Sequence, residues 1–560
     1  MAQLTKQQKL HLSKMRELET LSPFELKDKL IQLAADTNKA SARAMLNAGR
    51  GNPNWIATTP REAFFTLGRF GIEESKRVWD DPDLGGMPQK KSIAQRFRAF
   101  LDRNSKDAGV PLLRASLDYG VGKLGFDADA FVHELTDSII GDNYPVPDRM
   151  LTHCERVVHE YLVQEMCDRR PPRGKYDLFA VEGGTAAMCY IFDSLIINGL
   201  LKKGDTIALA TPVFTPYLEM PHLERYQFKV VSIEGSEMAK EGYHTWQYPD
   251  AEIDKLANPR IKAAFFVNPS NPASVAIRES SMRRLVKLVT TKRPDLMLLT
   301  DDVYGTFVDH FRSLMAELPR NTIGVYSYSK YFGCTGWRLG VIAIHQKNVY
   351  DEKLAALPAT TRKALNKRYG TITLEPEKLK FIDRMVADSR QVALNHTAGL
   401  SLPQQVQMAL FSLFALLDKD DKYKKLTQEI AKRRLKKLAD GVGVKLWDDP
   451  HRTGYYFTID LRNWALHEYG PEFVKFMDRF HPYDPLFALA ERAGIVLLNG
   501  SGFAAPDWSV RVSLANLDDA AYEQIGRELR AIMTGAGELW RKAQAKEAKP
   551  VKKSRVRRPA

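Results

Sequence analysis

The sequence predicts an α/β protein whose central domain is a doubly wound, mostly parallel sheet. Two observations lead to this fold class. Between residues 176 and 345, short runs of four to seven mostly apolar residues recur, as expected of strands covered by helices on both faces. These runs alternate with helix-like stretches such as "TAAMCYIFDSLIINGLLKKGD" and "ESSMRRLVKLVTTKRPD", which predicts crossover connections between parallel strands.

The strands are expected at "DLFAV", "TIALA", "FKVVSI", "AAFFV", "LMLLT", "TIGVYSY" and "LGVIAI". They place a large α/β domain at residues 151–375. Residues 1–150 read as mostly helical. Residues 376–540 begin with long helices and continue with the strand-like runs "GYYFTIDL", "GIVLLN" and "SVRVSLAN". We expect these flanking parts to form one small α+β domain built from both chain ends.

The charge of the chain is concentrated at its C-terminus. The formal net charge is +14, but the last 20 of the 560 residues alone carry nine Lys or Arg against one Glu. This segment, 541–560, has no aromatic residues and is expected to be a disordered, solvated tail. The remaining chain is only mildly basic for its size, so no specific nucleic-acid partner is expected.

Composition excludes several other classes. With 44% hydrophobic and 27% charged residues, the chain is globular and can bury a large core. Its four cysteines form neither a disulfide framework nor a zinc motif, so no metal is expected. The N-terminus lacks the apolar core of a secretory signal, and no apolar run approaches the roughly 20 residues of a membrane helix. We therefore expect a cytoplasmic protein without membrane contact.

Polar patterns follow several of the predicted strands, which is where ligands bind in such folds. "EGGTAAM" (182–188) follows "DLFAV" and opens a helix, so its free N–H groups could face an anion. "VNPSNPAS" (267–274) follows "AAFF" and could aim Asn271 inward as a neutral donor. Taken singly, the first pattern is weak, because many strand-to-helix turns contain glycine pairs, and the second favours a simple proline-stiffened loop.

Two further patterns carry ionisable groups. In "TDDVYGTF" (300–307), Asp301 and Tyr304 could reach one pocket and hold a protonated heterocyclic nitrogen and an aromatic oxygen, although a helix N-cap is the alternative for Asp301. In "SYSKYFGCTGWRLG" (327–340), a partly desolvated Lys330 could attack an aldehyde to give a Schiff base. Arg338 and Ser327 could then cradle a phosphate. Alone, Lys330 would read as a surface lysine.

Together and in this order, the motifs "NPxNP", "DxxY" and "SxSKxxxxxGWRxG" resemble those of the fold type I, pyridoxal phosphate-dependent aminotransferases of the aspartate aminotransferase class. The resemblance extends from about Asn47 to Asn516. It implies that Lys330 forms the Schiff base with the cofactor and that Asp301 pairs with its ring nitrogen. Asn271 and Tyr304 would hold the ring oxygen, and Tyr304 is counted with Lys330 as catalytic.

The same resemblance assigns the remaining cofactor and substrate residues. The phosphate would be bound by Gly184, Thr185, Ala186, Ser327 and Arg338. Phe214 would stack on the cofactor ring, for which core packing is the alternative. Tyr144, in "DNYPVP", would reach the phosphate of a neighbouring subunit, which implies at least a homodimer. Arg511, in "VRVSLAN", would grip the substrate α-carboxylate, and Gly51 lies in the family's substrate-side loop.

Chain length and several motifs resemble a narrower subfamily, the aspartate 4-decarboxylases, which also transaminate aspartate. The extra length lies at about 78–140 and in the C-terminal part, and "NPAS" departs from the more usual "NPTG". The resemblance implies conversion of L-aspartate to L-alanine and CO2, with transfer of the amino group to a 2-oxo acid as a second activity. It also implies an assembly of dimers, a dodecamer, in which the extra segments make contacts.

Arg50, beside Gly51, is our candidate for orienting the β-carboxylate, against the alternative of an exposed loop arginine. A plain aminotransferase acting on aspartate or aromatic amino acids remains the alternative function, because specificity depends on pocket shape. A cofactor-binding regulator is disfavoured, because residues 1–150 contain no convincing helix-turn-helix.

Overall fold

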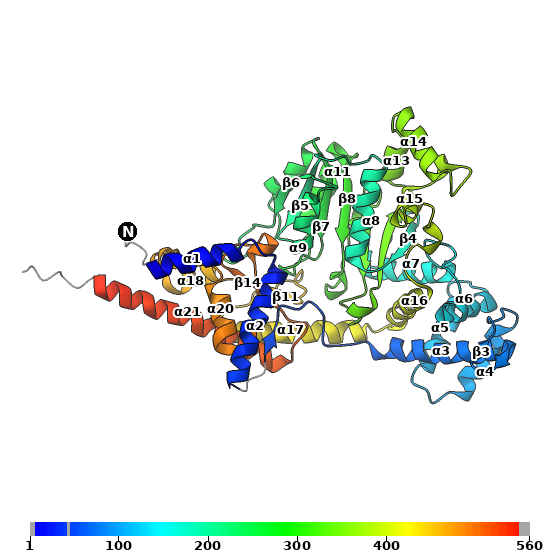
Figure 1. Cartoon of the computed structure of the whole chain (residues 1–560), viewed down its shortest axis with the longest axis horizontal. Helices are drawn as coiled ribbons and strands as arrows, with labels where there is room; N and C mark the ends of the chain where they lie inside the picture. Colours follow the sequence, from blue (N-terminus) through cyan, green and yellow to red (C-terminus); the bar gives the residue numbers. More distant parts are fainter. Residues whose placement is uncertain (1–5, 42–44, 548–560) are drawn as a thin grey trace, which may run out of the picture.

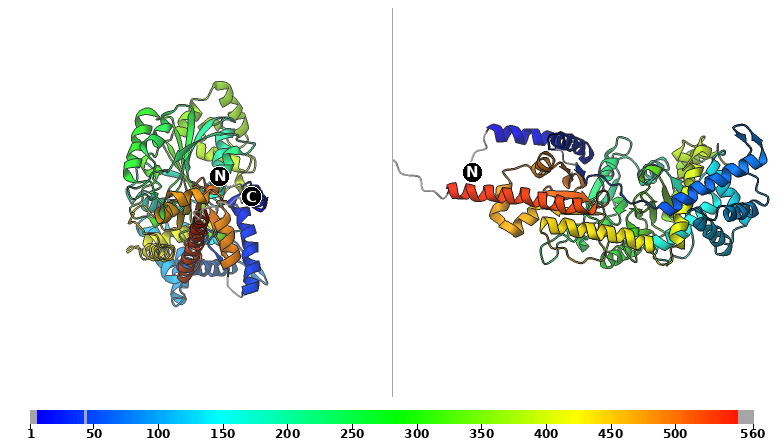
Figure 2. Two further views of the ribbon diagram at one scale, coloured as in Figure 1. Left: turned by 90° about the vertical axis from the view of Figure 1, so that its left-hand side faces the viewer. Right: turned by 90° about the horizontal axis from the view of Figure 1, so that it is seen from below.

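The computed structural model describes residues 6–41 and 45–547. Figure 1 shows a central sheet flanked by helices, a smaller domain on the left and a group of helices at the lower right. The right-hand view of Figure 2 shows that these three parts follow one another along the long axis of the molecule. The elements that form the active site come from the central sheet with its helices and from the smaller domain.

The central sheet of the described chain has seven strands in the order β4-β10-β9-β8-β7-β5-β6. β10 runs antiparallel to both of its neighbours, and the other pairs are parallel. The predicted α/β fold with a mostly parallel sheet is therefore confirmed. The strands are β4 (Tyr176–Val181), β5 (Thr206–Thr211), β6 (Lys229–Glu234), β7 (Ile261–Val267), β8 (Met297–Asp301), β9 (Thr322–Ser327) and β10 (Gly340–His345).

Both faces of this sheet are covered, which explains why its strands are apolar throughout. Phe265 on β7 joins the core beneath α8 (Gly184–Ile197), whereas its neighbours Ala264 and Phe266 join the core beneath α11 (Glu279–Lys292). Shorter helices complete these layers: α9 (Thr215–Glu219), α10 (Asp250–Asp254), α12 (Leu314–Glu317), α13 (Val349–Ala355) and α14 (Ala359–Tyr369).

The helical group at the lower right of Figure 1 contains the extra segment at about 78–140. Ile93, Phe97, Phe100 and Leu101 recur at helical spacing along α4 and are buried. The Phe97 and Phe100 rings lie 4.8 and 5.3 Å from the ring of Phe70 on α3. The elements are α3 (Thr58–Val78), β2 (Asp80–Asp81), β3 (Leu84–Gly85), α4 (Ile93–Arg103), α5 (Val110–Gly122) and α6 (Ala128–Ile140).

Helices α15 (Phe381–Ser389) and α16 (Leu402–Leu417) depart from the domain division expected from the sequence, which grouped residues 376–540 together. Phe381 and Met385 belong to the core beneath α8, and Val406 and Leu410 share a core with Val157 of α7 (Thr152–Met166). These two helices therefore pack on the large domain. Their apolar stripes predict burial but do not specify which core they enter.

The small domain is built from both chain ends, as predicted. Parallel strands β1 (Leu46–Asn47) and β12 (Ile495–Val496) pair directly, and one core contains residues from α2 and from the C-terminal helices. A three-stranded antiparallel sheet has the order β11-β14-β13. Its remaining elements are α1 (Lys6–Leu18), α2 (Pro23–Ser41), β11 (Tyr456–Asp460), α18 (Leu461–Tyr469), α19 (Pro471–Met477), α20 (Asp484–Ala493), β13 (Leu498–Asn499) and β14 (Ser509–Ser513).

Two long helices, α17 (Lys422–Val442) and α21 (Asp519–Glu547), pack side by side in this domain (Figure 2). α21 continues through residues 541–547, so the start of the expected tail is helical instead; residues 548–560 lie outside the described part. No helix within residues 6–41 and 45–547 is both long and apolar enough to span a membrane.

Candidate active site

The glycine turn after β4 forms one wall of a cavity between the two domains. Gly183 has φ of +90°, and α8 begins at Gly184, so the first N–H groups of the helix face the cavity edge. The Arg338 guanidinium donates to the carbonyls of Glu182 (3.1 Å) and Thr335 (3.2 Å). A Cβ on Gly183 would lie 2.5 Å from Arg338 Nη2, so glycine allows this close approach.

Lys330 follows β9 and faces the loop before α3. Its Nζ donates to the carbonyl of Gly51 at 3.0 Å, and the Tyr455 hydroxyl donates to the same oxygen at 2.8 Å. Ser327, at the end of β9, is buried and donates to the Ser329 hydroxyl at 3.0 Å. The amine is thus held within the cavity by a neutral acceptor, and no carboxylate of the described residues pairs with it.

Asp301 ends β8 and is buried at the base of the cavity. The Tyr217 hydroxyl donates to its Oδ2 at 2.7 Å, and the Val303 N–H donates to its Oδ1 at 3.2 Å. Burial raises the pKa of the Asp301 carboxyl, while these hydrogen bonds and the charge of Lys330 oppose the rise. Burial thus disfavours the ionised form of Asp301, and two fixed donors and the Lys330 charge partly restore it.

The neighbouring Asp302 has a different environment. It is hydrogen-bonded to the hydroxyls of Ser313 (2.5 Å) and Thr300 (2.7 Å) and does not line the cavity. Burial, reinforced by the charge of Asp301, raises the pKa of Asp302 to about 8. At neutral pH it is thus mostly protonated, so the strand end carries one carboxylate charge and not two.

Arg511 lies on β14 opposite these groups and is only 1% exposed. Its Nη1 donates to Asn271 Oδ1 at 3.2 Å and its Nη2 to the carbonyl of Gly49 at 2.9 Å. The guanidinium lies 4.3 Å from the Tyr456 ring centroid, and no carboxylate pairs with it among the described residues. Its buried Nε has no hydrogen-bond partner there either. This cation is left to pair with an incoming anion.

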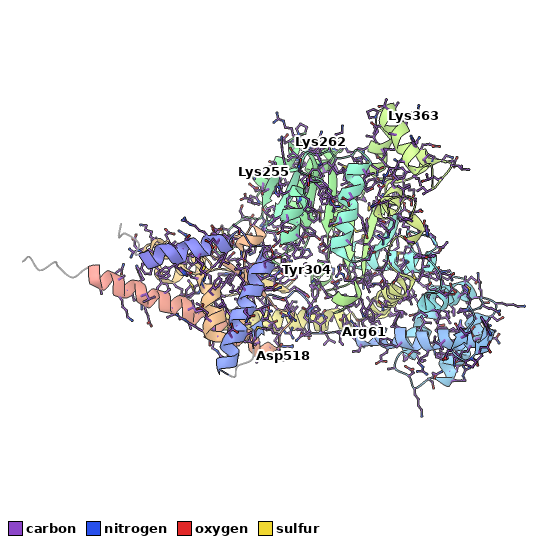
Figure 3. The ribbon with its side chains drawn as sticks, in the orientation of Figure 1. Arg61, Lys255, Lys262, Tyr304, Lys363 and Asp518 are labelled. Carbon is purple, nitrogen blue, oxygen red and sulfur yellow. The ribbon has the colours of Figure 1, made fainter. Side chains whose placement is uncertain are left out.

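Two tyrosines connect the groups. The Tyr304 hydroxyl donates to the Tyr456 hydroxyl at 3.0 Å, and both side chains are buried. Burial raises the pKa of Tyr304 well above its usual value, so the phenol stays protonated and can donate. In Figure 3, the labelled Tyr304 lies between the central sheet and the small domain.

The loop at 49–52 closes the cavity from the small-domain side. A Cβ on Gly51 would lie 2.8 Å from the Tyr456 hydroxyl and 3.2 Å from Lys330 Nζ, so no larger residue fits here without a shift. Arg50 is exposed but lines the same cavity. Phe214 also lines it and packs edge-to-face on Phe24 of α2, with ring centroids 5.9 Å apart.

The cavity has a volume of about 400 Å³, which is within the range of small-molecule sites. It brings together nearly all the sequence-predicted site residues: Arg50, Gly51, Gly184, Thr185, Phe214, Asn271, Asp301, Tyr304, Ser327, Lys330, Arg338 and Arg511. Ala186 lies in the first turn of α8 but does not line the cavity. Tyr144 is 66% exposed, packs on His396 and does not line it either.

Several lining residues were not assigned from the sequence, among them Tyr217, Tyr456, Phe24 and Lys27. Tyr217 stands three positions after Phe214 in "TPVFTPY". A buried Asp301 requires a hydrogen-bond donor, and this requirement is the signal that could have identified Tyr217. Tyr456 lies within "GYYFTIDL", which was recognised as a strand but not as part of the site. Phe24 and Lys27 reach the cavity from α2, and no local pattern marks them, because only the packing of the N-terminus on the small domain brings them there.

Comparisons with known proteins agree with the observed fold. The model of the family "Aminotransferase class I and II" matches residues 181–529. A Pseudomonas protein, "Bifunctional aspartate aminotransferase and L-aspartate beta-decarboxylase", is 50% identical over 533 residues, which span 95% of this chain and 98% of the relative. The chain belongs to the class I and II aminotransferases. An aspartate aminotransferase of Rhizobium meliloti is 26% identical over a shorter match, 30% of this chain and 39% of the relative.

Solved aminotransferases share the fold. An aspartate aminotransferase double mutant of Thermus thermophilus superposes with a TM-score of 0.53 at 17% identity, covering 95% of this chain and 100% of that one. Bna3p, a putative kynurenine aminotransferase of Saccharomyces cerevisiae, gives 0.56 at 16% identity, covering 92% and 96%. At such identities the likeness concerns the fold alone, and it confirms fold type I.

Class I and II aminotransferases are pyridoxal phosphate enzymes, and this cavity fits that cofactor. One end has helix N–H groups and Arg338, which suit a phosphate. The base has the buried carboxylate of Asp301, which suits a protonated ring nitrogen. The amine of Lys330 stands between them, and Phe214 provides a flat aromatic face.

Proposed function

We propose that this aminotransferase removes the β-carboxylate of L-aspartate to give L-alanine and CO2, and that it also transfers the amino group of aspartate to a 2-oxo acid. The observation that carries the proposal is a cavity in which Lys330 and Asp301 lie opposite the unpaired Arg511. The Pseudomonas relative supports it, because its 50% identity extends over nearly the full length of both chains.

The residues proposed to hold the cofactor are Lys330 through its amine, Asp301 at the ring nitrogen, Asn271 and Tyr304 at the ring oxygen, Phe214 on the ring face, and Gly184, Thr185, Ala186, Ser327 and Arg338 around the phosphate. When bound, pyridoxal phosphate supplies an electron sink for the pair left on the substrate carbon. Asp301 supports that role, because a buried carboxylate favours a positive charge beside it.

Arg511 is proposed to bind the substrate α-carboxylate. Its fork already donates to Asn271 and Gly49, so its orientation is fixed before substrate arrives. Lys330 then takes the Cα proton. This lysine is within 3.0 Å of the Gly51 carbonyl, which holds the amine on the substrate side of the cavity.

Arg50 is proposed to orient the β-carboxylate. Its side chain is exposed, so the ion pair it makes is weaker than that of the buried Arg511. A weak hold suits decarboxylation, because the group must lose its charge and leave as CO2. Glycine at position 51 lets this loop, and with it Arg50, approach Lys330 closely, because a Cβ there would lie 3.2 Å from Lys330 Nζ.

We further propose that the protein works in the cytoplasm as a homo-oligomer built from dimers. Tyr144 supports the dimer, because it is exposed and lies outside the cavity of its own chain. In this proposal it reaches the cofactor phosphate in a neighbouring subunit. The helical group around α4–α6 then makes contacts between dimers in a larger assembly, proposed to be a dodecamer.

The first experiment is to mix the purified protein with pyridoxal phosphate and L-aspartate, without a 2-oxo acid, and to measure CO2 and alanine. Sustained release of both supports the proposal, and Lys330→Ala should abolish it. Lys262→Ala is the matched control, because Lys262 is exposed on β7, far from the cavity (Figure 3). A single stoichiometric formation of oxaloacetate without CO2 would instead establish a plain aminotransferase.

A further inference from the structure

A second cavity of about 370 Å³ lies between the two domains, next to the active site. Three segments line it: residues 241–246 of the large domain, Ala273 and Val275 of the loop that carries Asn271, and parts of 443–468 in the small domain. β11 contributes to both cavities, Tyr456 to the active site and Phe457 to the second one.

The walls of this second cavity are flat aromatic faces. Tyr243 and Trp447 are stacked across the domain interface, with centroids 4.9 Å apart and planes inclined by 12°. His244 and Trp246 are stacked at 4.3 Å and 13°. Such faces bind planar rings better than bulky aliphatic groups, because stacking uses the whole ring area.

Two cations, Arg452 and Lys445, line the second cavity. Arg452 is partly buried, donates to the carbonyl of Trp447 at 2.7 Å and makes no ion pair within the described residues. Asp460 is paired with His244 at 2.9 Å, and Asp449 accepts the N–H of His451 at 2.9 Å. Burial lowers the pKa of Arg452, and the negative charge of Asp449 partly opposes that fall.

Hydrogen bonding in the wall is also incomplete. Trp464 Nε1 and His244 Nδ1 are buried and have no hydrogen-bond partner among the described residues, although both side chains line the second cavity. Buried polar atoms are usually paired, so two orphans in one wall indicate a missing polar partner. Glu241 and Glu468 are exposed at the rim, where water screens their charge.

We propose that this cavity is a second ligand site, which binds a planar aromatic carboxylate. The carboxylate pairs with Arg452, and the ring lies on the indole of Trp464 with the edge of Trp447 beside it, because the Trp447 ring already contacts Tyr243 and the Lys445 amine. A ligand of this class matches both the aromatic walls and the two lining cations, Arg452 and Lys445. Nothing in the proposed reaction uses this cavity, so the ligand is an effector and not a substrate.

The second cavity is mechanically connected to the active site through the loop after β7. Ala276 donates to the carbonyl of His451 at 2.8 Å, and Thr453 donates to that of Ser274 at 2.9 Å. The Thr458 hydroxyl donates to the carbonyl of Pro272 at 3.0 Å. A ligand that fixes the loop at 272–276 relative to residues 451–458 also fixes Asn271 relative to β11. Its binding therefore changes the affinity for aspartate.

The test is calorimetric titration of the holoenzyme with 2-naphthoate, in the presence of saturating succinate to block Arg511. Cyclohexanecarboxylate, which has the same charge but no aromatic ring, is the control probe. Arg452→Gln and Trp447→Leu should each weaken naphthoate binding by about tenfold or more. Arg462→Gln is the matched control, because this exposed arginine of α18 pairs with Asp478 outside the cavity.

The expected result is saturable naphthoate binding at one site per chain, weak binding of cyclohexanecarboxylate, and a change of at least about twofold in the KM for aspartate. Absence of binding, equal binding of the two probes, or equal binding by both cavity variants would overturn the site. Loss of naphthoate binding on adding succinate would place the ligand in the active site instead. Binding without a change in KM would overturn the connection to Asn271. If Arg452→Gln does not fold, as judged by thermal melting, Trp447→Leu decides.

Discussion

Replacing Tyr217 by Phe removes one hydroxyl and leaves the rest of the cavity wall in place. That hydroxyl donates to Asp301 Oδ2 at 2.7 Å, and both residues are buried. After the change, the Val303 N–H is the one remaining hydrogen-bond donor to the side-chain carboxyl of Asp301 in the described chain. A hydrogen bond to a charged group contributes about 1.5–3 kcal/mol. If the missing hydrogen bond destabilises the ionised form of Asp301 by that amount, kcat/KM decreases by about 10- to 150-fold.

The assay is kcat/KM for aspartate at saturating pyridoxal phosphate, measured across pH. Because the lost hydrogen bond lowers the pKa of Asp301, the acidic limb of the profile should move to higher pH in Tyr217→Phe. Tyr226→Phe is the matched control, since Tyr226 is a buried tyrosine that donates to Asp193 at 2.6 Å and does not line the cavity. A Tyr217→Phe enzyme within twofold of the parent, with an unmoved acidic limb, would refute the reasoning.

Three further variants test other parts of the site. Arg511→Lys cannot copy the fork that holds Asn271 and Gly49, so kcat/KM for aspartate should fall by about 100-fold or more, with cofactor absorbance retained. Gly183→Ala imposes φ of +90° on a residue with a Cβ and crowds Arg338, so cofactor affinity, followed by absorbance titration, should fall by at least about tenfold. Between about pH 4 and 8, Asp302 keeps its proton in the folded state but has lost it in the unfolded chain. The free energy of unfolding therefore decreases as pH rises, by up to about 1.4 kcal/mol per pH unit. Asp302→Asn should flatten that dependence of the thermal midpoint on pH; an unchanged slope would contradict the assignment.

The central sheet could be predicted because its strands are buried on both faces, which makes each a continuous apolar run. Most of the cavity followed, because Asp301 and Ser327 stand at the carboxyl ends of strands that must meet at one edge. Lys27 could not be predicted, since its position depends on how α2 docks on a core made 400 residues later in the chain. α16 was assigned to the C-terminal domain for a similar reason: an amphipathic pattern does not identify its partner.

α17 can transmit a rotation from the large domain to the small domain. Its first turns lie near the large domain, and its far end packs on α21 (Figure 1). With 21 residues it is about 31 Å long, so a tilt of about 5° at one end moves the other by roughly 2.7 Å. Arg434 on this helix donates to the carbonyls of Leu514 and Ala515, directly after the strand that carries Arg511. Arg434 lies about 18 Å along the helix from its first residue, so the same tilt of about 5° displaces Arg434, and the end of the strand that carries Arg511, by roughly 1.6 Å.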